Sequence, residues 1–249
     1  MIINDKDGNA MKTIGIIGAM DSEVRHLIAR LEGPEAHEIA GRTFVRGTLA
    51  GCDAVVVQSG IGKVAAAVTA QILIDRFGVD VLLNSGMAGG LDPRLAVKDL
   101  VVGTAAVQHD FDLTAFGHAP GYICGEDDTV ATAFRADEEL VALALDAAAE
   151  VLPTDSKAIT GVIASGDVFV DDSALKARII TEFDAAAAEM EGAAIAQTAD
   201  ANGVPFLILR TISDLAEHQA NVSFDELERY VGQLAEDITV ALLERLKNA

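Results

Sequence analysis

The chain has 249 residues, of which 51% are hydrophobic and only 4% aromatic, and its formal net charge is −21. This length and apolar content predict a substantial buried core, in one large domain or two small ones. With 39 acidic and 18 basic residues, the chain has no basic stripe to neutralise phosphates, so we expect no nucleic-acid partner.

The expected elements of the first half follow from apolar runs bounded by glycine and from runs with helical periodicity. In chain order they are a strand at 12–20 that breaks at Gly18, a helix at 21–31, three short strands within 37–60 punctuated by Gly41 and the Gly51-Cys52 turn, a helix at 61–78 with a Gly78 cap, and a strand at 79–90 that runs into a glycine-rich turn. The alternation predicts an α/β fold with buried parallel strands.

The second half continues the same alternation. Its expected elements are a strand at 99–110, a long loop at 111–133, a helix at 137–151, a strand at 157–167, a helix at 172–183, a strand-to-helix transition at Glu189 and Glu191, a strand at 203–214, and a helix at 223–246 whose Ser223 and Glu226 form a capping box. No linker or repeat separates these elements. We therefore expect a single domain at 11–249, preceded by a disordered extension at 1–10.

Cysteine usage and the N-terminus indicate the compartment. Cys52 and Cys124 lie outside any metal-ligand spacing and are expected to be free thiols in a reducing cytosol. Residues 1–10 lack the apolar core of a signal peptide, and no apolar run approaches membrane-spanning length. We expect a soluble cytoplasmic protein with no membrane partner.

Polar residues gather where the predicted strands end. Ligands of open α/β sheets bind beyond the carboxyl ends of the strands, so neighbouring strands would bring these clusters into one pocket. The clusters are 20–23, 59–63, 85–90, 165–169 and 210–214, with Glu189 and Glu191 at a comparable position.

Common catalytic and cofactor motifs are absent or weak. "GIIGAM" lacks the third glycine of a dinucleotide fingerprint, and "SGIGK" lacks the spacing of a P-loop. His109, Asp110 and Asp112 have no further His/Cys cluster that would support a metal site. No histidine accompanies the serines of "QSGIGK" and "IASGD" as a nucleophilic triad requires. We expect no metal and no cofactor.

Four charged residues remain open to two interpretations. Glu23 fits the first turn of a helix, where the macrodipole favours a carboxylate, but it could equally serve a site. Arg210 and Asp214 are four residues apart on one strand and are expected on the same face, either as a structural ion pair or with Asp214 functional. Glu191 in "AAEMEGAAIAQ" is either a solvated charge at a helix start or a buried acid of a site.

Seven segments together resemble a known family. They are "IGIIGAMDSEV", "SGIGKVAAA", "NSGMAGGL", "DLTAFG", "SGDVFV", "AAEMEGAAIAQ" and "RTISDLA". In this order they resemble the bacterial 5′-methylthioadenosine/S-adenosylhomocysteine nucleosidases of the nucleoside phosphorylase superfamily, from Met11 to the C-terminus. The resemblance implies a three-layer α/β/α fold around a mixed twisted sheet, a homodimer, and no cofactor.

The resemblance also implies roles for particular residues. Glu23 would position and deprotonate the attacking water, Asp214 would act on N7 of adenine, and Glu191 would bind the ribose hydroxyls. Breaking the N-glycosidic bond leaves a poor leaving group and a cationic ribose. An acid for the purine, a base for water and a negative charge near the sugar are therefore the groups that the chemistry needs.

Further residues are expected to bind the substrate by the same resemblance. Met190 would pack on the sugar, and Phe169 and Val170 would meet the base. Ser213 and Arg210 would support the purine and the water, and the role of Glu189 stays open. The full set of expected binding residues is Met20, Ile61, Met87, Ala88, Gly89, Phe169, Val170, Met190, Arg210, Ser213, Phe224 and Phe116.

Two departures from the family bear on the substrate. Met87 stands where many relatives have a small or hydroxyl residue, and the loop at 117–134 lacks their proline-rich sequence. The preferred 5′-substituent is therefore open, and 6-amino-6-deoxyfutalosine is a further candidate substrate beside methylthioadenosine and adenosylhomocysteine. A purine nucleoside phosphorylase using phosphate and a non-catalytic nucleoside-binding protein are the alternative functions.

Overall fold

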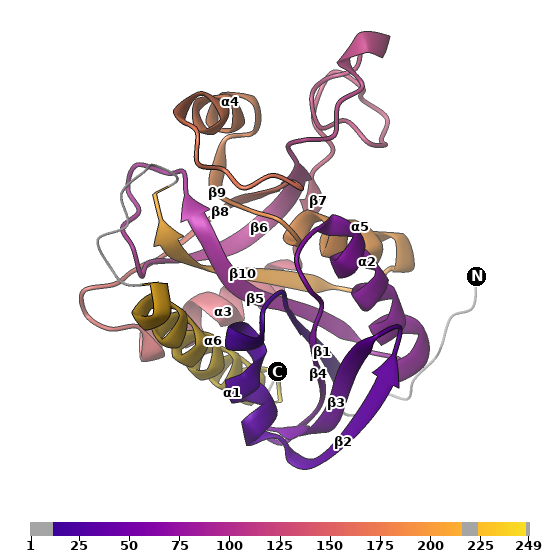
Figure 1. Cartoon of the computed structure of the whole chain (residues 1–249), viewed down its shortest axis with the longest axis vertical. Coiled ribbons are helices and arrows are strands. Elements are labelled where there is room, and N and C mark those ends of the chain that lie inside the picture. The colour runs from indigo at the N-terminus through magenta and orange to yellow at the C-terminus, as the bar shows by residue number, and fades with distance from the viewer. Residues whose placement is uncertain (1–11, 216–223, 248–249) are drawn as a thin grey trace.

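The computed structural model of the protein describes residues 12–215 and 224–247, in which a mixed sheet of ten strands forms the centre (Figure 1). The strands are β1 (Thr13–Gly18), β2 (Glu32–Ile39), β3 (Arg42–Leu49), β4 (Cys52–Gln58), β5 (Val81–Gly90), β6 (Leu100–Gln108), β7 (Phe134–Arg135), β8 (Ala158–Ser165), β9 (Ala185–Glu189) and β10 (Phe206–Asp214). The helices are α1 (Asp21–Arg30), α2 (Lys63–Ile72), α3 (Glu138–Val151), α4 (Ser173–Phe183), α5 (Gly192–Asn202) and α6 (Phe224–Leu246), with a π-helical turn η1 (Leu73–Phe77) and a 3-10 turn η2 (Thr114–Phe116).

The sheet combines parallel and antiparallel pairs, as predicted. Its order is β10-β6-β8-β9-β5-β1-β4-β3-β2, with β7 beside β6. β1 pairs in parallel with β4 and β5, whereas β2, β3 and β4 form antiparallel hairpins. Both hairpin turns have positive φ at two successive residues, Ala40-Gly41 and Ala50-Gly51, the geometry whose twist suits adjacent strands.

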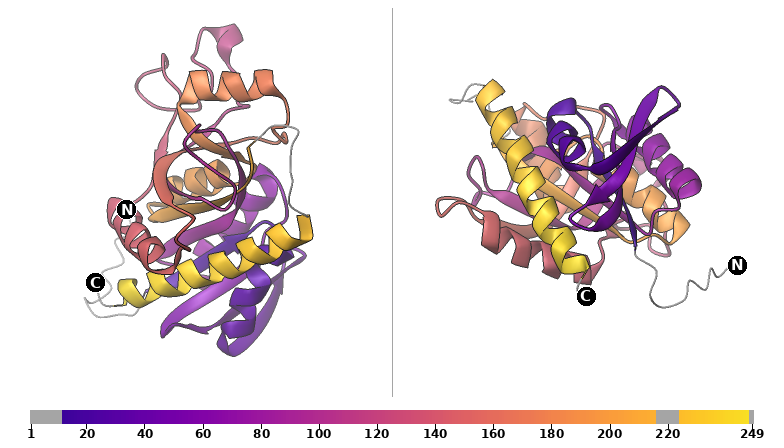
Figure 2. Two further views of the ribbon diagram at one scale, coloured as in Figure 1. Left: turned by 90° about the vertical axis from the view of Figure 1, so that its left-hand side faces the viewer. Right: turned by 90° about the horizontal axis from the view of Figure 1, so that it is seen from below.

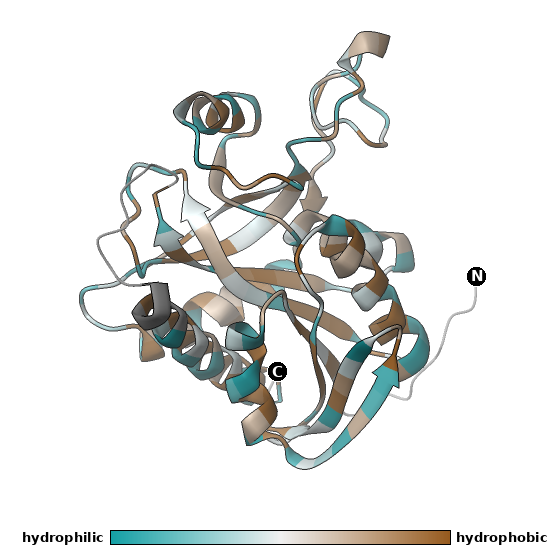
Figure 3. Cartoon of the chain, viewed as in Figure 1, coloured by the Kyte–Doolittle hydropathy of each residue, from teal (hydrophilic) through white to brown (hydrophobic). Residues whose placement is uncertain are grey.

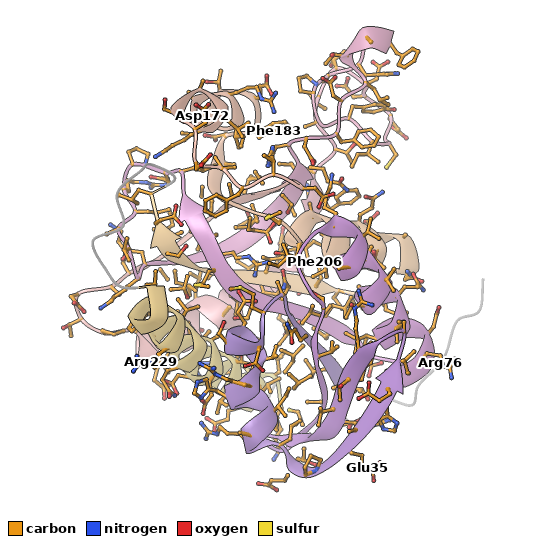
Figure 4. All side chains as sticks on the ribbon, viewed as in Figure 1. Glu35, Arg76, Asp172, Phe183, Phe206 and Arg229 are labelled. Carbon is orange, nitrogen blue, oxygen red and sulfur yellow. The ribbon has the colours of Figure 1, made fainter. Side chains whose placement is uncertain are left out.

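Helices cover the sheet on two faces and complete the predicted three layers. α1 and α3 pack against α6 on one face, and α2 packs against α5 on the other. Figure 2 shows the long α6 crossing its face diagonally. A smaller core under α4 includes Phe183, which lies on the side of that helix toward the sheet, while Asp172 caps the helix start (Figure 4).

One end of the sheet closes on itself. β10 pairs with β5 as well as with β6, so β5, β10, β6, β8 and β9 form a ring. The ring closes between β5 and β9, where Gly89 pairs with Ala188. Small side chains suit this narrow ring: β9 reads "AAAAE", and a Cβ at Gly161 of β8 would overlap Ala186.

Among the element boundaries that differ from the predictions, three have a clear physical reason. β2 begins at Glu32, before the expected 37, because it is an exposed edge strand whose polar residues give no apolar alternation (Figure 3). β5 continues to Gly90 without the expected turn, because β10 and β9 both pair with its glycine-rich end. α2 begins at Lys63, two residues later than expected, because Gly62 has a φ of 100°.

Several other predictions concern features at the ends of elements. Gly78 adopts the expected left-handed cap conformation, with φ of 62°. Cys52 and Cys124 are free thiols, as predicted. The expected extension at 1–10 and Ser223 of the predicted capping box lie outside the described residues. Among the helices within 12–215 and 224–247, none combines the length and the apolar character needed to cross a bilayer.

Candidate active site

Glu23 has its carboxylate folded back over the end of β1. Oε2 accepts hydrogen bonds from the backbone N–H groups of Ala19 (2.6 Å) and Met20 (3.0 Å), and Oε1 accepts one from Met87 on β5 (3.0 Å). The residue is only 5% exposed. Glu23 therefore does more than interact with the macrodipole of α1, because its carboxylate links the ends of two neighbouring strands.

Two glycines make room for this carboxylate. A Cβ at Gly86 would overlap both the carboxyl carbon and the oxygens of Glu23, and a Cβ at Gly18 would lie 2.9 Å from the Cβ of Glu23. Burial raises the pKa of Glu23, although Arg210 and the three N–H donors oppose that increase. A carboxylate that accepts a proton more readily than an exposed glutamate suits a general base.

Glu191 is buried, which decides between the two interpretations of "AAEMEGAAIAQ". It immediately precedes α5, is 6% exposed, and its Oε1 accepts a hydrogen bond from the N–H of Gly62, 2.8 Å away. Loss of water, and then the like charge of Glu189, raise the pKa of Glu191 to about 7, against the effects of Gly62 and Arg210. A solvated helix-start charge would not have this environment.

Arg210 joins the acids from the middle of β10. It forms a buried ion pair with Glu189, to which both Nε and Nη2 donate, and Nη2 also donates to Oδ1 of Asn84. Its guanidinium acts electrostatically on Glu23 and Glu191 as well. One buried cation therefore serves three carboxylates that come from distant parts of the chain.

Asp214 ends β10, but it does not form the structural ion pair with Arg210 that was one of the two interpretations. The register shifts by one residue between Ile212 and Asp214, so Asp214 pairs with Gly89 of β5 while Arg210 pairs with Gly86. This bulge breaks the alternation on which the same-face prediction rested, and Arg210 pairs with Glu189 instead. Ser213 donates a hydrogen bond to Oδ2 of Asp214 over 2.8 Å.

The expected binding residues divide by exposure. Those at the meeting point of β1, β5 and the β9–α5 junction are buried or half-buried: Met20, Met87, Ala88, Gly89 and Met190. Val170 is buried in the core beneath α4. Three large side chains are exposed instead: Ile61, Phe169 and Phe116.

One expected aromatic residue lies away from the strand ends, and the side chain of another lies outside the described residues. Phe116 is 79% exposed in the long loop that extends away from the body at the top of Figure 1. Phe224 begins α6, and its side chain lies outside the described part of the protein. The structure thus places Phe116 in an exposed loop apart from the strand ends, whereas the expectation for Phe224 stays a prediction.

A polar cluster beside Glu191 escaped the sequence analysis. Nζ of Lys63 contacts Oδ1 of Asp110 at 2.6 Å, and the backbone N–H groups of Lys63 and Asp167 donate to Asp167 Oδ1 and Asp110 Oδ2. The cluster joins the start of α2 to the ends of β6 and β8. A lysine directly after Gly62 and acids after two strands were visible signals, but their pairing depends on the closed ring.

Across the described residues, no group of three or more His, Cys, Asp or Glu side chains could hold a metal ion. Asp110, one of the residues considered in the sequence, bonds to Lys63 and to the Asp167 N–H instead. What the arrangement can do chemically is proton transfer and charge stabilisation, with three buried acids near one arginine.

Comparison with known families agrees with this geometry. The protein-family model described as the phosphorylase superfamily matches residues 13–247. The chain therefore belongs to the phosphorylase superfamily. This match spans every described helix and strand, including all five strands of the ring.

Individual relatives narrow the assignment. A 5′-methylthioadenosine/S-adenosylhomocysteine nucleosidase of Shewanella halifaxensis is 42% identical over 234 residues, which cover 94% of this chain and 99% of that protein. The crystal structure of such a nucleosidase from Colwellia psychrerythraea, in complex with adenine, is 41% identical with a TM-score of 0.87, covering 95% of this chain and 96% of that one. Within the superfamily, the chain falls in the family of these nucleosidases.

A third relative has a different named activity. The native futalosine hydrolase of Helicobacter pylori is 36% identical with a TM-score of 0.84, covering 94% of this chain and 98% of that one. Enzymes named for different substrates therefore share this fold at similar identity.

Proposed function

We propose that the protein is a hydrolase that cleaves the N-glycosidic bond of 5′-thio-substituted adenosines, releasing adenine and the substituted ribose, with water as the nucleophile. 5′-Methylthioadenosine and S-adenosylhomocysteine are the proposed substrates, because the relatives are named for them. The observation that carries the choice of water is the position of the Glu23 carboxylate.

That carboxylate occupies the donors that an anion would need. Backbone N–H groups at a helix start and a glycine-rich strand end form a natural phosphate site. Here the N–H groups of Ala19, Met20 and Met87 all donate to Glu23. The buried Arg210 is likewise held by Glu189. A phosphate would have to displace one carboxylate and lie against others, so water is the better nucleophile and the phosphorylase alternative is disfavoured.

A different carboxyl group acts on each side of the scissile bond, one as a base and one as an acid. Glu23 takes the proton of the attacking water, and its raised pKa suits that task. Asp214, hydrogen-bonded by Ser213, delivers a proton to N7 of the departing adenine. On β5, Asp214 pairs with Gly89, and Glu23 accepts a hydrogen bond from Met87. Gly89 and Met87 are two residues apart, which separates the two contact points by about 7 Å along the strand.

Glu191 acts on the sugar between these acids. Its carboxylate accepts hydrogen bonds from the ribose hydroxyls and opposes the positive charge that develops on the ring. Because that charge exists only near the transition state, the interaction strengthens during the reaction and raises kcat. Arg210 limits the repulsion between Glu191 and Glu23, which would otherwise resist holding both charges.

Apolar residues hold the rest of the nucleoside. Phe169 and Val170 follow β8 and meet the base, while Met190 packs on the sugar. The remaining assignments, to base, sugar or 5′-substituent, are Met20, Ile61, Met87, Ala88, Gly89, Phe116 and Phe224. The preferred substrate is tested by comparing kcat/KM for methylthioadenosine, adenosylhomocysteine and 6-amino-6-deoxyfutalosine. The third compound is included because the chain is similar to a futalosine hydrolase.

A second copy of the chain completes the site. Ile61, Val64 and Val68 form an exposed apolar stripe along the start of α2, and Val168 and Phe169 are exposed on the segment whose Asp167 bonds to Lys63. These five residues make one apolar patch beside Glu191, and burial in a homodimer would remove it from water. Light scattering should give about twice the 25.9 kDa chain mass, and Val64→Asp should reduce both mass and activity. A fully active monomer would contradict the dimer.

The free thiols suit a reducing compartment, and we propose the cytoplasm. Cys124 is exposed, so it would be vulnerable to oxidation outside a reducing environment. Fractionation of cells of the source species with an antibody to the protein would test this location.

The nucleophile is tested by product analysis. Purified protein should release adenine from methylthioadenosine in phosphate-free buffer and form no pentose 1-phosphate when phosphate is added. A requirement for phosphate would overturn the hydrolase in favour of the phosphorylase. Binding of the nucleoside without release of adenine would favour the non-catalytic binding protein.

A further inference from the structure

Glu189 lies one residue from Met190 and two from Glu191, yet it points into the protein. Its side chain is 3% exposed. Its carboxylate accepts hydrogen bonds from Arg210, from the hydroxyl of Ser165, and from the backbone N–H groups of Glu191 (3.1 Å) and Gly192 (2.8 Å). Both oxygens are fully engaged within the protein, so this acid has no capacity left for a ligand.

These contacts fix the backbone that carries Glu191. The N–H groups of Glu191 and Gly192 belong to the start of α5, where Glu189 satisfies donors that the helix leaves free. Ser165, on β8, reinforces the same turn because its Oγ accepts from the N–H of Ala193 at 2.7 Å. The orientation of the Glu191 side chain is thus set by a strand end, a hydroxyl and a neighbouring carboxylate.

The same carboxylate also forms an ion pair with Arg210, the only arginine close to the site acids in the described structure. Arg210 donates to Glu189 through two nitrogens and makes its other hydrogen bonds to Asn84 and to the carbonyl of Leu209. It donates none to Glu191 or Glu23. A direct ion pair with either acid would neutralise the charge that the proposed reaction uses.

We propose that Glu189 is a positioning residue for the hydrolysis: it fixes the turn that presents Glu191 and keeps the guanidinium of Arg210 from pairing with that acid. The negative charge of Glu191 then remains without a direct ion pair until the cationic sugar forms. This inference rests on the proposed function, and it assigns Glu189 a part in the reaction without contact to the substrate. The contrasting interpretation is that Glu189 only caps α5 and buries a charge pair.

The first test is Glu189→Gln, which keeps the size and one acceptor oxygen but removes the charge. Arg210 is then free to attract Glu191, and the like charge that raises the pKa of Glu191 is gone, so that pKa falls. We expect the acidic limb of kcat/KM to move to lower pH by about one unit or more. We expect kcat to fall by up to about 100-fold, with a smaller change in KM, because a misplaced group lowers turnover more than binding.

A helix cap alone would not change the pH profile. If Glu189→Gln lowers the melting temperature but leaves kcat and the pH profile of kcat/KM unchanged, the proposal is wrong. Glu236→Gln is the matched control, since Glu236 is 7% exposed and pairs with Arg30 away from the site acids. It should change stability alone, with kcat and the pH profile as in the wild type.

A second variant, Ser165→Ala, separates the effect of positioning Glu191 from the effect of the Glu189 charge. It also tests the proposal if the Glu189→Gln protein does not fold. It removes the hydroxyl that links Glu189 to Ala193 but leaves the charge of Glu189 in place. We expect a lower kcat with the acidic limb unmoved. A folded Ser165→Ala protein with wild-type kcat would overturn the positioning role.

A measurement that does not depend on turnover separates this inference from the proposed function. Carboxyl ¹³C NMR can follow the titration of Glu191, with its signal assigned from Glu191→Gln. The titration midpoint should be lower in Glu189→Gln than in the wild type, and an equal midpoint would contradict the charge argument. A wild-type protein that releases no adenine would instead refute the proposed function, whatever the NMR result.

Discussion

Two arginine–carboxylate groups in this molecule use the same chemistry with opposite outcomes. Where β1, β3 and β4 meet, Arg46 donates two hydrogen bonds to Asp53, at 3.1 and 2.6 Å, and Thr13 adds a third at 2.9 Å. At the other end of β1, Arg210 pairs with Glu189 while Glu23 and Glu191 lie near it. In the first group Arg46 has one hydrogen-bonded acid, Asp53, and the exposed Glu35 on the neighbouring strand, whereas in the second three buried acids surround Arg210.

The pKa values follow from this difference. Partial burial raises the pKa of Asp53, but the hydrogen bonds from Arg46 and Thr13 outweigh burial and leave it below the usual range. Deep burial and the charge of Glu189 instead raise the pKa of Glu191 to about 7. An acid with its own arginine stays ionised and stabilises the fold, whereas surplus buried acids can exchange protons near neutral pH.

The sharpest way to break this comparison is to neutralise the proposed base and acid. Glu23→Gln and Asp214→Asn should each reduce turnover by roughly 10²–10⁴-fold, the contribution of a general base or acid. Adenine release under saturating substrate measures the loss. Asp53→Asn is the control, and it should retain wild-type turnover. Losses of only a few-fold in both site variants would mean that these acids are as structural as Asp53.

Glu191→Gln tests whether the surplus charge acts on the sugar. It should lower kcat on the order of 100-fold, because the charge opposing the cationic ribose is lost. A 2′-deoxy substrate should lose much less in the variant than in the wild type. Steady-state kinetics of the four combinations measure this coupling, and strictly additive losses would show that Glu191 and the hydroxyl never meet.

The pH dependence of kcat/KM reports the free enzyme. Because Glu191 must be ionised and its pKa is about 7, kcat/KM should fall about tenfold per unit below that pH. Glu191→Gln should lack this limb. A wild-type profile of kcat/KM that stays flat down to pH 5 would contradict the raised pKa of Glu191.

The same acid should cost stability. Its folded-state pKa lies above the ordinary value of 4.5, so folding is favoured while it is protonated and that advantage is lost as pH rises through about 7. Glu191→Gln should therefore stabilise the protein at pH 8 by on the order of 1–3 kcal/mol, and much less at pH 4. Urea unfolding at both pH values measures the difference, and equal effects at the two would contradict the shift.

Asp53→Asn should give the smallest effect, with the opposite pH dependence. The folded-state pKa of Asp53 is lowered, so its contribution is present above the unfolded pKa and disappears as the pH falls through the folded value. Its side chain is 27% exposed and that of Arg46 is 43% exposed, so we expect a loss below about 1 kcal/mol at pH 7. Urea unfolding at a series of pH values should show the difference from the wild type shrinking as the pH falls below the ordinary value of 3.8.

The sequence predicted the elements and the strand-end acids because both depend on local pattern. Apolar runs and glycine boundaries located the strands, and the rule for strand ends brought Glu23 and Glu191 to one place. It could not predict that Glu189 pairs with Arg210, since this requires β9 and β10 to flank β5 in a closed ring. It also missed the bulge before Asp214, which inserts a residue without any glycine or proline to mark it.

The strand ring has a consequence for the order in which the molecule folds. Its closing pairs join Gly89 to Ala188 and Leu82 to Phe206, so more than half of the chain must be gathered before they form. Such closures are slow because their entropy cost precedes any gain in contacts. We therefore expect the antiparallel β2–β3–β4 meander to form early and the acids to meet late. Nascent or truncated chains should then stay inactive, and a bound nucleoside analogue should slow unfolding by holding the ring shut.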